Sequence, residues 1–346
     1  MPSIKAPRLL ALFQKRIDGD DALLELARLR FKEAGLGAEY YAANSEELSW
    51  LLNYQPRPEA PVIVHLPREI DLFDKEGRRK LLSFAAEFKE RVYGFVVHDQ
   101  IEIIDRFDEY KVALTEIDAA LQAVKRSPFL FIEYAAGLAP EFFCELIESI
   151  QELQQISACI DIGHLGIWQA RDAFRRKHPD EDICGLDPSD AGLSELVEDV
   201  QAAVKTSLPT VLRLIRRLGG LGKPLHFHLH DGHPLSTASS FGVSDHLSFF
   251  TAIPIPFLFK GKRALAPMFG LAGIRKIVAD ICAILDGDYI SFTLEIHPTA
   301  GRLPLGDASH LFNHWLDKSN AEQMNYWLTD LLENHRLLQR DPVSRP

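Results

Sequence analysis

The chain alternates short, almost uninterrupted apolar runs with longer stretches in which apolar residues recur every three or four positions. Continuous Val, Ile and Phe are typical of a strand buried on both faces, whereas the 3.6-residue period indicates an amphipathic helix. The predicted strands are 8–13, 38–43, VIVHL (62–66), YGFVVH (93–98), FLFIEY (129–134), SACIDI (157–162), LHFHLH (225–230) and YISFTLEI (289–296). Eight strands separated by helices are what an α/β protein of the (β/α)8 TIM-barrel class requires.

Capping residues support the helices between these strands. The helix predicted over 21–35 ends at Gly35, and Asn44 or Ser45 caps the helix EELSWLLNY. Further helices are predicted over KLLSFAAEFKERV (80–92), PEFFCELIESIQELQQ (140–155) and, at the end, AEQMNYWLTDLLENHRLL (321–338).

The spacing of the strands predicts one domain with two insertions. Strand ends recur about every 30 residues as far as Asp161, which suits one strand and one helix per repeat. The next two intervals are about twice as long. We therefore predict a single TIM-barrel domain over 1–346 with insertions at about 165–200 and 234–267, both on the C-terminal face. The second contains FFTAIPIPFLFKG, whose Phe and Pro residues suit a lid or a subunit contact.

Acid and imidazole side chains stand at, or just beyond, the C-terminal ends of six of these runs. Alternate side chains of a strand share a face, so these groups are predicted to converge at the barrel mouth. One buried histidine is more often hydrogen-bonded than metal-bound, but buried carboxylates need a cation or a proton. A carboxylate and imidazole set without thiolate suits Zn, Mn, Mg, Fe or Co. The candidate metal ligands are His65, His98, Glu133, Asp161, His164, His228 and Glu295.

Several polar residues near this set have two interpretations. His226 and His230 share the inward face of His228, and we expect them to pack or hydrogen-bond rather than bind metal. His297 is predicted to hydrogen-bond behind Glu295. The basic run QARDAFRRKH (169–178) is either a solvated helix face or a site that captures a substrate phosphate.

Composition narrows the function classes. The chain has 346 residues, of which 47% are hydrophobic and 25% charged, with a net charge of −11. This acidity disfavours broad binding to nucleic acid or to anionic membranes, although a local basic groove stays open. Its four cysteines form no CxxC pattern, so neither a disulfide framework nor a zinc–thiolate site is expected. Without a signal-peptide pattern or an apolar run of about 18 residues, the predicted location is the cytoplasm and no membrane contact is expected.

Over about residues 8–335 these motifs resemble the xylose isomerase-like TIM-barrel superfamily. This group contains many sugar isomerases and epimerases as well as endonuclease IV (AP endonuclease family 2). In the epimerases a Glu, Asp, His, Glu set binds one metal ion, and the resemblance maps that set onto Glu133, Asp161, His228 and Glu295. It implies that Glu133 and Glu295 act as base and acid, with His164 polarising the carbonyl.

The endonuclease IV branch binds three metal ions, and this sequence matches its additional ligands in part. The two strand-end histidines that join the glutamate at a first ion correspond to His65 and His98. A third ion uses the histidine equivalent to His164 and an Asp-x-His pair, for which the counterpart here is Asp245–His246. These two are adjacent, so shared ligation requires a bent backbone. The alternative pair Asp231 and His233 has the family's spacing but follows His228 closely.

Three function classes follow. The favoured one is isomerase or epimerase chemistry on a small sugar or sugar phosphate, which the acidic chain and the predicted insertions suit. The second is an endonuclease IV-like phosphodiester hydrolase, for which His65 and His98 are the best argument; nucleic acid as a partner is disfavoured because no basic, aromatic-rich loops follow the early strands. The third is a non-catalytic metal-binding barrel. The expected cofactor is one to three divalent ions (Zn, Mn, Mg or Co) per chain, and an oligomer is compatible with the sequence.

Overall fold

In the computed structural model the described residues are 8–12, 20–59, 62–186, 192–235, 246, 265–296, 328–329, 331–336 and 338. The chain divides into two compact units by its internal contacts. Unit 1 is drawn from Met1–Asp161, Arg217–His228 and Ile284–Thr293. Unit 2 is drawn from Ile162–Arg216, Leu229–Ala283 and Leu294–Pro346.

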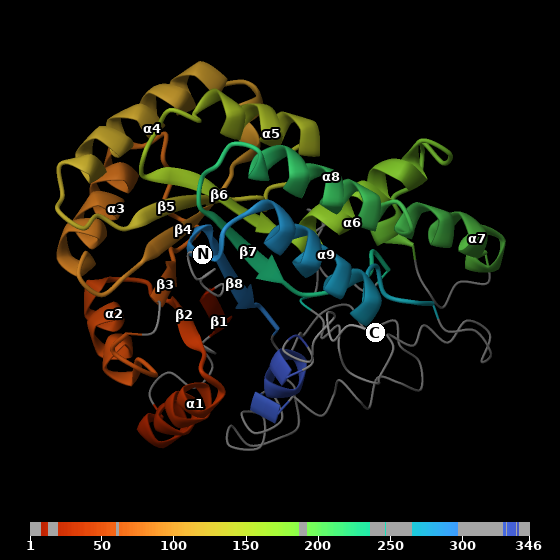
Figure 1. The fold of residues 1–346 in the computed structure, drawn as a ribbon. Coiled ribbons are helices and arrows are strands. Elements are labelled where there is room, and N and C mark those ends of the chain that lie inside the picture. Colours follow the sequence, from red (N-terminus) through yellow and green to blue (C-terminus); the bar gives the residue numbers. More distant parts are fainter. Residues whose placement is uncertain are drawn as a thin grey trace. The chain divides into compact units, whose positions relative to one another are not determined.

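Eight strands form a closed barrel in chain order, and the pairs from β1 to β7 are parallel (Figure 1). The strands are β1 (Arg8–Leu12), β2 (Gly37–Tyr41), β3 (Val62–His65), β4 (Gly94–His98), β5 (Phe129–Glu133), β6 (Ile156–Asp161), β7 (Leu225–Leu229) and β8 (Ile290–Leu294). All eight predicted strands are present, and each begins and ends within two residues of its predicted limits. The (β/α)8 barrel prediction is therefore confirmed.

Helices connect the strands as predicted, but two differ from their predicted bounds: the helix predicted over 80–92 covers 75–88, and the one predicted over 140–155 ends at Ser149. The helices are α1 (Asp21–Ala34), α2 (Ser45–Leu51), α3 (Lys75–Phe88), α4 (Phe107–Gln122), α5 (Pro140–Ser149), α6 (Ile162–Arg175), α7 (Leu193–Val204), α8 (Ser207–Gly219) and α9 (Gly270–Ile284). Short 3-10 turns are η2 (Leu52–Tyr54), η3 (Ile101–Ile104), η4 (Ile183–Gly185) and η5 (Gly287–Tyr289). In Figure 1, α3, α4 and α5 lie along the outside of the strands that precede them. Residues 331–336 are helical, as predicted for the closing helix.

The predicted caps account for where helices begin and end. Asn44 rather than Ser45 caps α2, because its side chain accepts the N–H of Glu47 at 2.9 Å. Helix α1 stops at Gly35, whose φ of 73° lies in the left-handed region that glycine adopts without steric cost.

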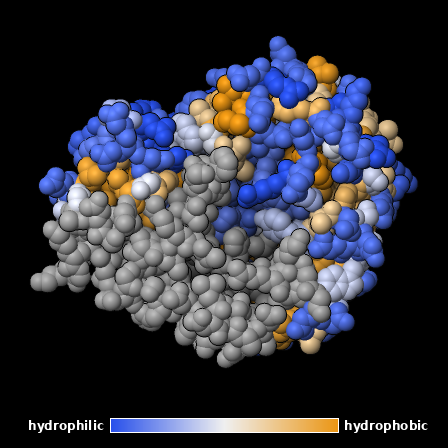
Figure 2. All heavy atoms as spheres, turned by 180° about the vertical axis from the view of Figure 1, so that it is seen from behind, coloured by the Kyte–Doolittle hydropathy of each residue, from blue (hydrophilic) through white to orange (hydrophobic). Residues whose placement is uncertain are grey.

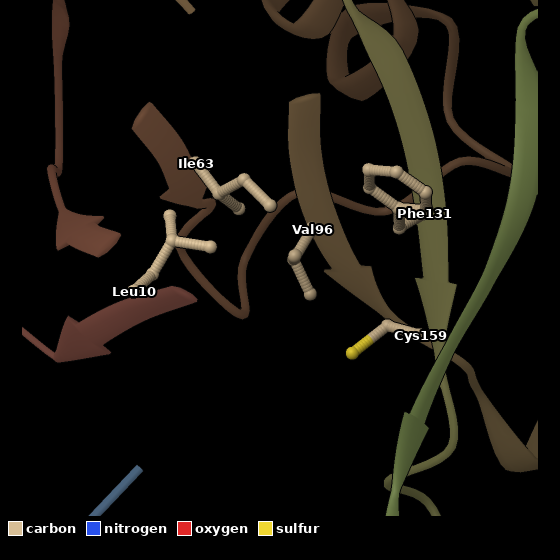
Figure 3. Packing of buried hydrophobic residues seen from close by; sticks show 5 residues of the cluster. All are labelled: Leu10, Ile63, Val96, Phe131 and Cys159. Carbon is tan, nitrogen blue, oxygen red and sulfur yellow. The ribbon is translucent and has the colours of Figure 1, made fainter. Parts of the chain in front are cut away.

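Alternation along the strands builds an apolar layer inside the barrel. Leu10, Ile63, Val96, Phe131 and Cys159 come from five strands, are fully buried and lie around a common space (Figure 3). Four of them stand two residues before a strand-end acid or imidazole. Because residues two apart on a strand point to the same face, the layer directs those polar side chains to the same interior.

Figure 2 shows the described surface from one side. On the face drawn in Figure 2, hydrophilic residues predominate and hydrophobic patches are separate. Within the described residues no helix is both long and apolar enough to cross a bilayer. Most of the predicted insertion at 234–267, together with Asp245 and His297, lies outside the described residues. The limits of the predicted domain and insertions stay a prediction.

Candidate metal centre

In unit 1, three predicted ligands from neighbouring strands meet at one carboxylate oxygen. His65, His98 and Glu133 are the last residues of β3, β4 and β5. Oε2 of Glu133 lies 2.8 Å from Nε2 of His65 and 3.4 Å from Nε2 of His98. His65 and Glu133 are buried, whereas the His98 side chain keeps 18% of its surface exposed. This group, which we call the Oε2 group, is therefore reached by solvent on the His98 side.

The other oxygen of Glu133 faces a second set of ligands from the next two strands. Oε1 lies 3.3 Å from Nδ1 of His228, and the same nitrogen lies 3.8 Å from Oδ2 of Asp161. Ligand atoms of Glu133, Asp161 and His228 all lie within 4.8 Å of one another. The barrel register explains the meeting, because Asp161 of β6 pairs with His228 of β7.

Hydrogen bonding determines which ring nitrogen of His65 faces Glu133. Nδ1 lies 3.0 Å from the carbonyl oxygen of Leu66, which can only accept, so Nδ1 carries a proton. Burial alone would lower the pKa of His65, but Glu133 outweighs it and raises that pKa. Burial would likewise raise the pKa of Glu133, yet His98, His228 and His65 together hold it well below its usual range. The 2.8 Å contact therefore favours the protonated form of His65 and the ionised form of Glu133.

These donors fit a divalent ion. Two ligand atoms about 2.1 Å from one tetrahedral zinc ion lie roughly 3.4 Å from each other. The His98–Glu133 contact of 3.4 Å and the His228–Glu133 contact of 3.3 Å match that separation. An ion would displace any proton on the His65 nitrogen that faces Glu133, since imidazole ligands must be neutral. All these donors are carboxylate oxygens and imidazole nitrogens, which suit zinc, manganese or cobalt.

Asp99 holds the ends of β4 and β5 together beside this group. Its backbone N–H donates to the Glu133 carbonyl at 2.8 Å, and its Oδ1 accepts the N–H groups of Ala135 (2.8 Å) and Ala136. Burial raises the pKa of Asp99 to about 7, although these two N–H donors oppose the shift. Asp99 thus fixes the chain immediately after His98 and Glu133.

Unit 2 contains a second group, rich in imidazole. One ring nitrogen each of His164, His230 and His246 lies within 4.8 Å of the other two. Oε2 of Glu295 lies 3.4 Å from Nε2 of His246 and 4.0 Å from Nε2 of His230. His230 donates from Nδ1 to the Asp231 carbonyl at 3.1 Å, which leaves Nε2 for the group. We call these four residues the imidazole group.

The backbone around the imidazole group determines where its side chains lie. His164 stands in the first turn of α6, where a Cβ on Gly163 would come within 2.1 Å of Cε1 of His230. Only glycine leaves room for that ring at this position. Asp231, buried, accepts the N–H of Gly270 at 2.7 Å and so fixes the start of α9; its burial raises its pKa to about 6. His246 has φ of 53°, so the backbone bends there, while Asp245 lies outside the described residues.

Two residues join these groups that the sequence did not single out as ligands or partners. Glu39, in the middle of β2, lies 3.1 Å from imidazole nitrogens of both His226 and His228. His230 was expected to pack or hydrogen-bond rather than bind metal, yet one of its ring nitrogens lies among those of the imidazole group. The sequence contains one indication that Glu39 has a partner: it is the only acid in the apolar run AEYYAA, and a buried acid is costly without one. His226 is packed and hydrogen-bonded, as expected.

The basic run 169–178, which begins on α6 and continues past the end of that helix at Arg175, does not offer a cluster of unpaired cations. Arg171 lies 3.0 Å from Asp182, Arg176 lies 2.6 Å from Asp172, and Lys177 lies 2.5 Å from Asp199. Asp199 also contacts His178 at 2.9 Å. These pairs favour the interpretation as a solvated helix face over capture of a substrate phosphate.

Fold and side chains together define a (β/α)8 barrel with buried carboxylate and imidazole groups able to bind metal. No protein-family profile matches the chain, and no curated protein sequence matches it. A GH10 endoxylanase retrieved from a sugarcane soil metagenome aligns over 84% of this chain and 86% of that chain, with 13% identity and a TM-score of 0.45. The carboxyl transferase domain of Rhizobium etli pyruvate carboxylase with pyruvate and biocytin aligns over 99% of this chain and 50% of that one, with 11% identity and a TM-score of 0.35. The chain thus spans about half of that carboxyl transferase chain, and neither likeness assigns it a function.

Proposed function

We propose that this chain is a divalent-metal-dependent phosphodiester hydrolase of the xylose isomerase-like superfamily, with Glu133 shared between two ions. The observation that supports the proposal is that the two oxygens of the Glu133 carboxylate face different candidate ligands. Oε2 faces His65 and His98, and Oε1 faces His228. A one-ion centre at Oε1 would have no use for His65 and His98. A carboxylate with ligands on both oxygens is suited to bridging.

The role of the protein in this chemistry would be to hold the ions and to orient the substrate beside them. A bound pair of ions would supply hydroxide at neutral pH and neutralise charge on the leaving oxygen. His65 and His98 would hold one ion, and Asp161 and His228 the other. The buried setting of Glu133 and His65 limits water around the ligands, while the exposed part of His98 gives access for a substrate.

The imidazole group is proposed to hold a further ion. His164, His230 and His246 supply three neutral nitrogen donors, which suit zinc better than magnesium or calcium. Glu295, in contact with His246, would balance the charge. The proposed content is therefore two or three ions per chain. His230 takes part here together with the predicted His164 and His246, and the predicted ligand Asp245 lies outside the described residues.

The second candidate is the isomerase or epimerase acting on a small sugar or sugar phosphate. The net charge of −11 and the pairing of Arg171, Arg176 and Lys177 with carboxylates favour it, because a nucleic-acid substrate would need cations open to phosphate. In this alternative Glu133 and Glu295 would be base and acid, with His164 polarising the carbonyl. One ion would suffice.

Replacing His65 with alanine separates the two candidates. In the two-ion hydrolase the variant is expected to lose about one ion per chain and to hydrolyse a chromogenic phosphodiester at least about 100-fold more slowly, because second-ion ligands act directly on the reacting centre. In the one-ion isomerase, metal content and sugar turnover should stay near wild type. Elemental analysis and both assays are made on the same preparations.

His178→Ala is the matched control for His65→Ala. His178 pairs with Asp199 and belongs to neither group. Its metal content and activities should equal those of wild type. Unchanged metal content and unchanged hydrolysis in His65→Ala would exclude the shared-carboxylate centre.

A further inference from the structure

Glu39 of β2 is a buried carboxylate that lies within hydrogen-bonding distance of two imidazoles of β7. Its Oε2 lies 3.1 Å from Nε2 of His226, and its Oε1 lies 3.1 Å from Nε2 of His228. All three side chains are completely buried. A carboxylate removed from water needs hydrogen-bond donors on its oxygens, and here each oxygen has an imidazole within hydrogen-bonding distance.

The contacts of Glu39 determine where the imidazole protons lie. Each oxygen of its carboxylate faces one imidazole nitrogen at 3.1 Å. A buried carboxylate needs a hydrogen-bond donor on each oxygen, so Nε2 of each histidine donates. A neutral His228 therefore carries its proton on Nε2 and a lone pair on Nδ1.

Nδ1 of His228, which carries this lone pair, faces the candidate ligands Glu133 and Asp161. Nδ1 of His228 lies 3.3 Å from Oε1 of Glu133 and 3.8 Å from Oδ2 of Asp161. If the proton were on Nδ1 instead, His228 would donate to these carboxylates and could not bind an ion between them. The tautomer of His228 thus decides whether the Oε1 side of Glu133 can form a metal site.

His226 supports this arrangement, and both of its ring nitrogens have polar partners. Its Nδ1 lies 2.9 Å from Oγ of Ser291 in β8, and its Nε2 is engaged by Glu39. Oγ1 of Thr293, also in β8, lies 3.4 Å from Nε2 of His226. Two histidines of β7 therefore hold the Glu39 carboxylate, and residues of β8 hold one of them, His226.

We propose that Glu39 is a positioning residue, which holds His228 as the Nε2–H tautomer so that Nδ1 is presented to Glu133 and Asp161 as a metal ligand. The inference rests on the proposed metal centre. It assigns a function to a residue in the interior of β2, one strand away from any predicted ligand. Partners of this kind behind a metal-binding histidine typically change metal affinity by about 10–100-fold when they are replaced.

The test compares Glu39→Gln with wild type for affinity toward Zn²⁺, by competition with a chromophoric chelator. Glutamine has the same shape, but its amide can donate to Nε2 of His228 and so favour the other tautomer. We expect far-UV circular dichroism to be unchanged and zinc affinity to fall about 10–100-fold. Ser291→Ala is the control: it removes a contact of His226 and leaves the Glu39–His228 contact, so its affinity should stay within about threefold of wild type.

A second measurement on the unaltered chain does not depend on how variants fold. Long-range 1H–15N spectra of metal-free, histidine-labelled protein report the tautomer of His228, assigned by comparison with His228→Gln. The Nε2–H form supports the proposal. An Nδ1–H form, or wild-type zinc affinity in Glu39→Gln, would overturn it and leave the proposed metal centre standing. A wild-type chain that binds no zinc would instead remove the metal centre, and this inference with it.

Discussion

Replacing Glu133 with glutamine is expected to empty the Oε2 group and to lower kcat/KM for phosphodiester hydrolysis by at least about 10³-fold, or roughly 4 kcal/mol of transition-state stabilisation. The amide is neutral and has one acceptor oxygen, whereas the carboxylate places one oxygen beside His65 and His98 and the other beside His228. Two cations cannot share such a group. Metal content by elemental analysis and hydrolysis of a chromogenic phosphodiester measure the two effects.

The fold should survive this change, because glutamine keeps the volume of Glu133 in its buried place. Far-UV circular dichroism checks that expectation. Glu148→Gln is the matched control, since Glu148 pairs with Arg217 at 2.6 Å on α5 and touches neither metal group. It should retain wild-type metal content and activity. Full metal content together with full activity in Glu133→Gln would show that the carboxylate is not a shared ligand.

Removing metal with a chelator is expected to lower the thermal midpoint of the wild-type chain, and added Zn²⁺ should restore it. At a free concentration of about 100 times Kd, a single ion that binds only the folded chain stabilises it by about 2.7 kcal/mol. For a protein of this size that corresponds to a shift of several degrees. Differential scanning calorimetry with and without zinc measures the shift.

The increase in thermal midpoint that zinc produces should become smaller as pH falls. The pKa of His65 is raised, so this imidazole keeps its proton to higher pH than a free one, and an ion must displace that proton. Zinc affinity therefore rises as pH increases through the pKa of His65 and is lost below it. Glu133→Gln, measured in parallel, should show a smaller shift at each pH. A midpoint independent of zinc at all pH values would argue against a buried ion.

The fold, and the meeting of five candidate ligands in unit 1, could be predicted from the sequence because both depend on local patterns. Uninterrupted apolar runs identified the parallel strands, and their ends identified the polar residues. In a barrel all strand ends of one direction form one rim, so placement at a strand end is enough to predict that side chains meet. His65, His98, Glu133, Asp161 and His228 follow this rule.

Glu39 and His230 did not follow from the sequence for different physical reasons. Glu39 lies in the interior of β2, paired with Ile63 of the apolar layer, so its depth in the barrel depends on the stagger between strands. His230 follows the end of β7, where alternation no longer determines direction, and its place depends on the space left by Gly163. Both positions are set by packing between segments that are distant in sequence.

The most direct test of the shared-carboxylate centre is the metal content per chain, by elemental analysis of protein purified without a chelator or a nickel-affinity step. We predict two or three ions, with zinc prominent. A single exchangeable manganese, magnesium or cobalt ion would contradict the shared carboxylate and support the sugar isomerase or epimerase instead. No metal in the purified chain, and none taken up on dialysis, would contradict the metal centre altogether.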